Sequence, residues 1–434
     1  MKKIRIGVFG VYRGTSMIRY CKSCDTAEVV AMCDKWEEGL ERQKEHNKDL
    51  DITYYTSFDE FIKHDMDAVV LANYANEHAP FAIKALKAGK HVISEVLPCQ
   101  TMKEAVELIE AVEESGLVYS YAENYCYMSG VYEMKRLYEE GKIGEIEYAE
   151  GEYIHNCDAI CHCLSYGDPD HWRNNLYSTF YCTHSFGPIR HITGLRPVSV
   201  VGLESLRKPE RKKTIGKGAG FGVEMVTLEN GTIVRSVHGS LYKDSIWYCL
   251  YGTRGRMETA RAEADEARYN HLYVNYDEYS GTYDTTYREN YRADERLEGA
   301  AAKAGHGGSD FFTMDNFIRR INGDTSADII DVYEALDMSL VGMFAFRSIL
   351  AGGVTVEIPN LRNKEEREKW RNDTACTDPK VAGDMLLPCR KGGNPVIDPV
   401  LVERDKMLWE AELASRQGYS NDAFSQPEAN KHNQ

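Results

Sequence analysis

The sequence predicts an α/β protein: an N-terminal Rossmann-like, doubly wound parallel sheet, then an α+β domain with an open, mainly antiparallel sheet. Short apolar runs alternate with helical segments over roughly the first 124 residues, as in βαβ units. Strand-like runs separated by hairpin and turn signals follow. The 434 residues are enough for two domains and an extension, which we place at 1–124, 125–358 and 359–434.

The first domain is predicted strand by strand from its apolar runs. The strands are expected at Ile4–Phe9, Val29–Cys33, around Tyr54, Ala68–Ala72, His91–Ser94 and Val118–Ala122. The helices between them are expected at 15–24, 37–48, 58–63, 79–88 and 103–115. Right-handed crossovers bring the carboxyl ends of these strands to one edge of the sheet, where ligands bind in such folds.

The second domain is predicted from longer strand-like runs. Strands are expected at 146–155, 198–203, 223–228, 232–237 and 246–251, with a type I′ hairpin turn at Asn230-Gly231. A polar, tyrosine-rich insertion is expected at about 254–305, and helices at 310–322 and 331–351. The extension should wrap the body, form one helix near Pro399–Arg416, and end in about a dozen disordered residues.

Composition narrows the class of protein. The chain has 52 basic and 68 acidic residues, a net charge of −16, which disfavours nucleic acids and anionic membranes as partners. We expect neither. The N-terminus enters a strand at once, which predicts a cytoplasmic protein with 12 reduced cysteines. The 28 tyrosines exceed 13 phenylalanines and suit a polar, sugar-binding pocket.

The first strand is followed by a weak form of the dinucleotide fingerprint. It reads Gly10-Val11-Tyr12-Arg13-Gly14-Thr15, with Tyr12 where a second glycine is usual. Asp34 ends the second strand, where a carboxylate binds ribose hydroxyls and disfavours a 2′-phosphate. The combination predicts NAD, whereas an ordinary turn with a surface aspartate is the alternative.

Several stretches together resemble the Gfo/Idh/MocA oxidoreductases. They are 85–92 (Ala-Leu-Lys-Ala-Gly-Lys-His-Val), between Asn73 and Glu95, and the turn 251–255 (Tyr-Gly-Thr-Arg-Gly). The resemblance spans about residues 1–358 and implies NAD(P) and a sugar-like substrate. The predicted cofactor-binding residues are Gly10, Tyr12, Arg13, Gly14, Thr15, Asp34, Asn73, His78, Glu95, Asn124, Trp172 and Arg173.

A narrower resemblance points to the glycosidase branch of that family, the NAD-dependent α-N-acetylgalactosaminidases and their relatives. It rests on runs at 123–127, 151–156, 172–177, 183–188 and 305–311. It implies oxidation of the sugar at C3, loss of the C2 proton, departure of the aglycone from C1, water addition and re-reduction. The net reaction is hydrolysis.

Two departures bear on this resemblance. Typical oxidoreductases of the wider family carry Glu-Lys-Pro after the fifth strand, but this chain has Glu95-Val96-Leu97-Pro98 and no lysine. The glycosidase branch also lacks that lysine. Around His184, that branch more often has a proline before the threonine and a glycine after the histidine. Sugar specificity is therefore not expected to transfer.

The predicted catalytic residues are His184, Tyr153 and His155, and the predicted substrate-binding residues are these three and Tyr181. The resemblance makes His184 the catalytic histidine, since imidazole suits proton transfer near neutral pH. The alternative is a helix-capping histidine. Tyr153 and His155 lie two residues apart and share one strand face. Tyr153 is either an acid/base or a sugar-stacking ring.

The segment 155–163 gathers three cysteines and two histidines, which suggests zinc. Its spacing is not a pair of Cys-x-x-Cys motifs, so no bound metal is expected. Two alternatives to the glycosidase remain. One is a net NAD-dependent sugar or glycoside 3-dehydrogenase, and the other is a non-catalytic NAD- and sugar-binding regulator. The open sheet face predicts a homo-oligomer.

Overall fold

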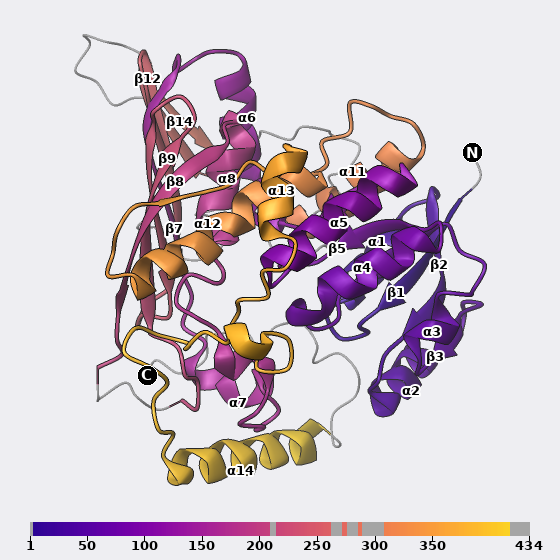
Figure 1. Ribbon diagram of the computed structural model, residues 1–434. Helices are drawn as coiled ribbons and strands as arrows, with labels where there is room; N and C mark the ends of the chain where they lie inside the picture. The colour runs from indigo at the N-terminus through magenta and orange to yellow at the C-terminus, as the bar shows by residue number, and fades with distance from the viewer. Residues whose placement is uncertain (1–2, 209–213, 262–270, 276–284, 289–307, 417–434) are drawn as a thin grey trace.

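The structure is a computed structural model that describes residues 3–208, 214–261, 271–275, 285–288 and 308–416. Figure 1 shows a smaller parallel sheet formed by the N-terminal part of the chain and a larger sheet formed by the middle part. Helices lie between the two sheets. The predicted disordered tail lies outside the described residues.

The first sheet has six parallel strands in the order β3-β2-β1-β4-β5-β6, as a doubly wound fold requires. The predicted parallel sheet is confirmed. Its strands are β1 (Ile4–Phe9), β2 (Ala27–Cys33), β3 (Thr53–Tyr55), β4 (Ala68–Leu71), β5 (His91–Ser94) and β6 (Tyr119–Tyr121). Its helices are α1 (Thr15–Ser23), α2 (Glu37–His46), α3 (Phe58–Phe61), α4 (His78–Lys87) and α5 (Met102–Ser115), with short 3₁₀ turns η1 (Ala75–Glu77) and η2 (Asn124–Tyr127).

One helix from far along the chain also packs on this sheet. It is α11 (Ser309–Ile321), which contacts α1 and η2. Its Phe311 and Phe317 belong to the same hydrophobic cluster as Ile6 and Val8 of β1. The Rossmann layer is therefore completed by residues from beyond position 300.

The second sheet has nine strands in the order β14-β13-β12-β11-β7-β10-β9-β8-β15. All its pairs are antiparallel except β7 with β10, which are parallel. The strands are β7 (Ile146–Ile154), β8 (Pro197–Ser205), β9 (Phe221–Leu228), β10 (Ile233–Gly239), β11 (Ser245–Gly252), β12 (Gly255–Thr259), β13 (His271–Asn275), β14 (Thr285–Arg288) and β15 (Val356–Glu357). The predicted open, mainly antiparallel sheet is confirmed.

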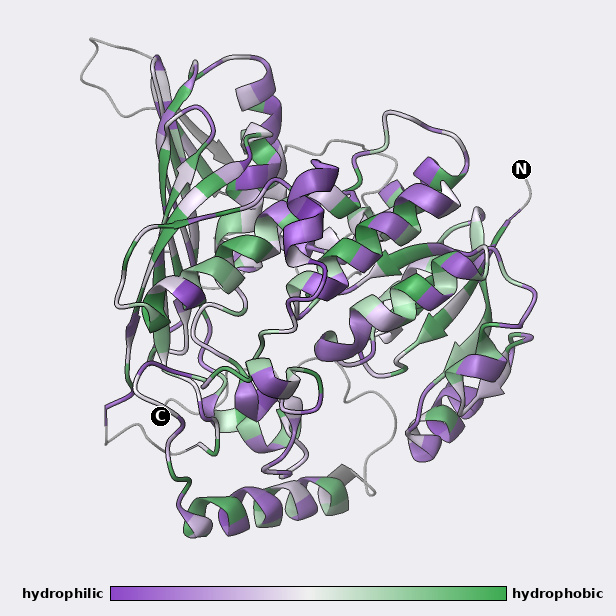
Figure 2. Cartoon of the chain, viewed as in Figure 1, coloured by the Kyte–Doolittle hydropathy of each residue, from purple (hydrophilic) through white to green (hydrophobic). Residues whose placement is uncertain are grey.

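Two helices cover one face of this sheet, α8 (Thr183–Thr193) on β7 and α12 (Val332–Leu350) on β8. Glycines permit the close approach. A Cβ atom at Gly151 would lie 2.0 Å from the Ser185 carbonyl oxygen, and one at Gly202 would lie 2.1 Å from that of Ala345. Figure 2 shows that α12 is largely hydrophobic, as expected for a helix packed between other elements.

Two sequence predictions need correction. The expected insertion at 254–305 contributes strands β12 to β14, with Met257, Leu272 and Val274 buried. Polar residues and tyrosines between these positions obscure the alternation of apolar and polar residues by which a strand is predicted. The β9–β10 hairpin is present, but its turn is not type I′, because Gly231 has φ +89° and Asn230 does not have a positive φ. The loop follows the three-residue pattern, a turn closed by a left-handed glycine.

The remaining elements belong to neither sheet. They are α6 (Ser129–Glu139), η3 (Asp158–Ile160), α7 (Cys161–Leu164), η4 (Trp172–Asn175), α13 (Lys364–Trp370), η8 (Gly383–Met385) and α14 (Pro399–Arg416). The sequence analysis did not predict α6 or α13. Arg367 and Arg371, on and just after α13, pair with Glu113 and Glu110 of α5. The extension then reaches α14, which packs on α7 at the edge of the molecule (Figure 1).

Candidate active site

A buried histidine–glutamate pair lies between the two sheets. His184 is in the first turn of α8, and its Nδ1 is 2.7 Å from Oε1 of Glu123, which follows β6. Their side chains are 9% and 0% exposed. We assign the proton to Nδ1, since a carboxylate can only accept from it. Nε2 is then the basic nitrogen of His184.

Aromatic rings surround this histidine. The ring centroids of Tyr125, Tyr153 and Tyr181 lie 4.5, 4.6 and 5.7 Å from that of His184. His238 stacks on Tyr153 at 5.8 Å, since the two residues are paired in the register of β10 and β7. We call these five residues the ring cluster. It offers flat apolar faces and hydroxyl groups, which suit a sugar.

The protonation of three neighbouring groups differs. Burial raises the pKa of Tyr153 well above its usual value, so this phenol stays protonated at neutral pH and can donate a hydrogen bond. Burial lowers the pKa of His238 to about 4, and this imidazole is neutral. The hydrogen bond with Cys157 and the charge of Asp244 raise the pKa of His155 to about 9. A protonated His155, 44% exposed, is a poor general base.

Arg173 and Trp172 link the ring cluster to the first domain. The Nη1 of Arg173 donates to the Tyr181 hydroxyl at 3.0 Å, and the guanidinium lies 4.6 Å from the centre of the Trp172 ring. Trp172 packs with Ala75 and Leu97, which follow β4 and β5. These two residues therefore lie between the ring cluster and the loops that follow β4 and β5.

The loop after β1 is shaped to accept a dinucleotide. Gly10 has φ +99°, and a Cβ there would lie 2.3 Å from the Ala72 carbonyl. A Cβ at Gly14 would lie 2.5 Å from a Val8 methyl group. Asp34 accepts from the Val11 amide at 2.8 Å, which places its carboxylate beside the loop. These features fit NAD, because the glycines give the close turn and the carboxylate stands where ribose hydroxyls bind.

The other residues of the predicted loop have separate roles. Tyr12 is 56% exposed, and the Thr15 hydroxyl donates to the Val11 carbonyl at 3.0 Å. Arg13 pairs with Glu95 at 2.7 Å and with Asp310 of α11 at 3.1 Å. Asp310 also accepts from the Asn124 amide at 3.0 Å. Arg13 thus bridges Glu95 and Asp310, and Asp310 in turn joins Arg13 to Asn124.

Two further predicted cofactor residues lie after β4. The side-chain oxygen of Asn73 is buried with no hydrogen-bond partner in the described part of the chain. His78 is 1% exposed and its ring nitrogens lie 2.8 and 3.3 Å from the carbonyl oxygens of Leu97 and Asn73. Burial lowers the pKa of His78 to about 4. His78 therefore positions the two loops, and Asn73 retains an unused polar atom.

Sequence reasoning assigned no role to four residues that the structure brings into the site: Glu123, Tyr125, His238 and Asp310. Glu123 and Asp310 stand inside the runs that carried the family resemblance, and Glu123 directly follows a predicted strand. Glu123 lies 61 residues before its partner His184, and Asp310 lies 186 residues after its partner Asn124. His238 lies one residue beyond a predicted strand and is aligned with Tyr153 only once that strand pairs with β7.

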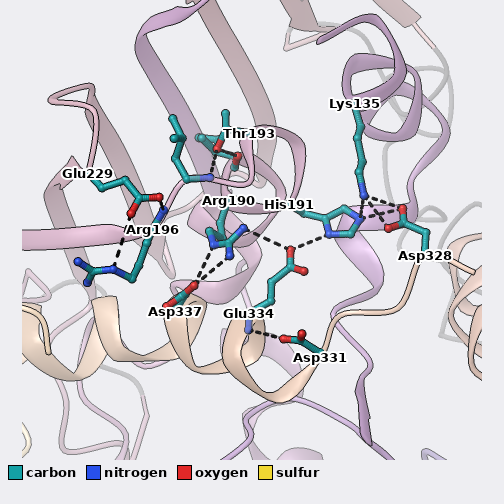
Figure 3. Close-up of polar contacts among 12 residues, drawn as sticks. Lys135, Arg190, His191, Thr193, Arg196, Glu229, Asp328, Asp331, Glu334 and Asp337 are labelled. Atoms are coloured by element: carbon teal, nitrogen blue, oxygen red, sulfur yellow. Dashed lines mark hydrogen bonds and ion pairs between the residues drawn. The ribbon is translucent and has the colours of Figure 1, made fainter. Parts of the chain in front are cut away.

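The second histidine of α8 belongs to a different network (Figure 3). His191 lies 2.8 Å from Glu334 and 3.2 Å from Asp328, which also pairs with Lys135 at 2.6 Å. Arg190 pairs with Asp337 at 3.0 Å. A cavity of about 800 Å³ opens beside this network, and none of the ring cluster lines it. We assign the network to holding α8 against α12.

Comparison with known protein families agrees with this architecture. Residues 4–123 match the Gfo/Idh/MocA model, described as an oxidoreductase family with an NAD-binding Rossmann fold. Together with the glycine cradle and Asp34, this match supports an NAD-dependent enzyme. Residues 229–371 match the C-terminal domain of glycosyl hydrolase 109. The chain therefore joins a Gfo/Idh/MocA Rossmann domain to a glycosyl hydrolase 109 C-terminal domain.

Relatives and solved structures extend the comparison. A glycosyl hydrolase family 109 protein of Solibacter usitatus is 26% identical over 85% of this chain and 89% of its own length. An alpha-N-acetylgalactosaminidase of Tannerella forsythia is 24% identical over 77% of this chain and 80% of its own. The fold resembles aldose-aldose oxidoreductase of Caulobacter crescentus, with a TM-score of 0.65, 18% identity, and coverage of 82% of this chain and 100% of that one. Within the described residues, no helix has the length and apolar character needed to cross a membrane.

Proposed function

We propose that this enzyme is a glycosidase that oxidises the C3 hydroxyl of a glycoside and restores it within one catalytic cycle. The observation that carries the proposal is the His184–Glu123 pair inside the ring cluster. The position where dehydrogenases of the wider family carry a lysine is held by Val96 and the buried Leu97. His184 is then the group suited to exchange a proton with the sugar hydroxyl.

Each side chain of the site has its own role in the proton transfer from the C3 hydroxyl. Nε2 of His184 takes the proton of the C3 hydroxyl, and the carboxylate of Glu123 stabilises the resulting imidazolium. Tyr153, protonated because burial raises its pKa, donates a hydrogen bond to the sugar. Tyr125 and Tyr181 provide stacking faces. NAD, when bound, supplies a reversible acceptor for the hydride from C3.

The later steps follow from the ketone at C3. The ketone acidifies the proton at C2, and loss of that proton expels the aglycone from C1. Water then adds at C1, a proton returns to C2, and the ketone is reduced to the hydroxyl again. The sum is a glycoside plus water giving a free sugar and a free aglycone, without net oxidation.

The sugar is not carried over from the relative named as an alpha-N-acetylgalactosaminidase. Here Cys182 precedes Thr183, and Ser185 follows His184, whereas that branch more often has proline and glycine at these positions. Both residues are fully buried next to the catalytic histidine. We therefore propose a glycoside with a different sugar.

The test uses the protein as purified. Denaturation releases any bound NAD(H) for assay, and a panel of nitrophenyl glycosides is then incubated with native protein and no added NAD. In D₂O, the sugar product should carry deuterium at C2. His184→Ala should abolish cleavage, whereas His46→Ala, at an exposed position on α2, should retain it.

The outcomes separate the mechanisms. Bound NAD, cleavage without NADH accumulation and deuterium at C2 support the cycle. Cleavage without deuterium at C2 would refute the elimination step. Turnover only with added NAD, matched by NADH absorbance, would instead establish a net dehydrogenase, and full activity of folded His184→Ala would remove His184 from the mechanism.

A further inference from the structure

The cysteine- and histidine-rich segment 155–163 lies outside the ring cluster. His155 bonds to Asp244 at 3.1 Å, and the chain then forms η3 and α7. Cys157, Cys161 and Cys163 are half-buried cysteines that form no disulfide. None of these three cysteines has a role in the chemistry proposed above, and neither does His162.

A third metal-binding side chain reaches this segment from the end of the described chain. One carboxylate oxygen of Glu412 on α14, a nitrogen of His162 and the sulfur of Cys163 all lie within 4.8 Å of one another. All three residues are half-buried. Within the described residues, this is the one group of three or more such ligands.

The donor set selects the kind of metal. A thiolate and an imidazole favour zinc over magnesium or calcium, which prefer oxygen ligands only. In tetrahedral zinc sites the bond lengths of 2.0–2.3 Å put ligand atoms about 3.3–3.8 Å apart. The separations here need to shorten by at most about 1.5 Å, which side-chain rotation can supply. The fourth ligand would be water.

The helix that carries Glu412 is held against the α7 loop by two further contacts. A Cβ at Gly167, whose φ is +63°, would lie 2.9 Å from Cα of Lys406, so the helix backbone touches the loop there. The ring of Trp409 lies 5.2 Å from that of Tyr166. Trp409 and Glu412 are three residues apart and share one helix face. The outward residues Val400 and Met407 are 71% and 66% exposed.

We propose that His162, Cys163 and Glu412 bind one Zn²⁺ that fastens α14 to the α7 loop. This reverses the expectation of no metal, because the sequence spacing could not show that residue 412 returns to residue 163. None of its three ligands takes part in the proposed glycosidase chemistry. The bound zinc would add three metal–ligand bonds to the existing contact between α14 and the α7 loop.

The test measures zinc directly on the full chain. Protein is incubated with excess Zn²⁺, dialysed without chelator, and assayed by elemental analysis. We expect one zinc per chain. Cys163→Ser and Glu412→Gln should raise the Kd by at least about 100-fold, more than loss of an outer-shell partner costs. Cys24→Ser and Glu410→Gln are matched controls, a half-buried thiol elsewhere and an exposed carboxylate on the same helix.

Two readouts establish the geometry. Co²⁺ substitution should give a thiolate charge-transfer band that is absent in Cys163→Ser, and removal of zinc should speed hydrogen exchange in 399–416. Circular dichroism checks that each variant is folded. Less than one-tenth of a zinc per chain, or equal zinc in folded Cys163→Ser and Cys24→Ser, would overturn the proposal. Unchanged exchange in 399–416 after zinc removal would overturn the fastening role.

Discussion

Glu123→Gln tests the proposed role of the histidine–glutamate pair. The amide oxygen of glutamine can still accept the hydrogen bond from Nδ1, but the negative charge 2.7 Å from that nitrogen is lost. Charges about 4 Å apart interact by about 4 kcal/mol at an effective dielectric constant of about 20. Because the hydrogen bond persists, we assign about 3 kcal/mol to the lost stabilisation of the imidazolium. We expect kcat to fall about 100-fold.

The assay is release of nitrophenol from the glycoside that the native protein cleaves. A charge that acts on proton transfer lowers kcat and leaves KM within about twofold. The matched control is Glu133→Gln, a buried carboxylate on α6 that pairs with Arg136 at 2.6 Å, away from the ring cluster. A kcat unchanged in a folded, NAD-containing Glu123→Gln would refute the reasoning.

Three further predictions concern the cofactor cradle and the α8 network. Gly10→Ala should abolish NAD retention, because the new Cβ would lie 2.3 Å from a backbone carbonyl; NAD released on denaturation measures this, and stoichiometric NAD would contradict it. Asp34→Ala should weaken NAD binding and reduce the preference for NAD over NADP, seen in the two Kd values; an unchanged ratio would exclude Asp34 as the selector. Burial alone would lower the pKa of His191, but Glu334 and Asp328 raise it to about 9. The stability it contributes, about 3 kcal/mol at most, is therefore complete below pH 6.5 and lost as the pH rises through about 9. The difference in unfolding free energy between native protein and His191→Gln should shrink over that range, and a constant difference would rule this out.

The parallel sheet could be predicted well because its signals are local. Ala68–Leu71 and His91–Ser94 are short apolar runs, and strands buried on both faces need nothing else. The helix Pro399–Arg416 was also predicted with its observed bounds. Strands β12 to β14 were missed because charged residues and tyrosines are interspersed along these sequences, and such residues are typical of loops as well.

The site could be predicted only in part, because its contacts are made by segments far apart in the sequence. His184 stood in a familiar run, but its orienting partner Glu123 is 61 residues earlier. The pairing of Tyr153 with His238 depends on the register between β7 and β10. The pKa of His155 is raised by the nearby Cys157 and also by Asp244, which is 89 residues away. No local pattern encodes the distant partners.

The contact between Asp310 and Arg13 has a consequence for how such proteins recombine. The loop that cradles the dinucleotide is braced by a carboxylate from α11, and the apolar side of that helix completes the first hydrophobic layer. A gene fusion that transplanted residues 1–124 alone would leave Arg13 paired with Glu95 but without Asp310, its second counter-ion. It would also expose the apolar surface on which Phe311 and Phe317 pack. The first domain therefore depends for its complete packing on a helix that belongs to the second family match.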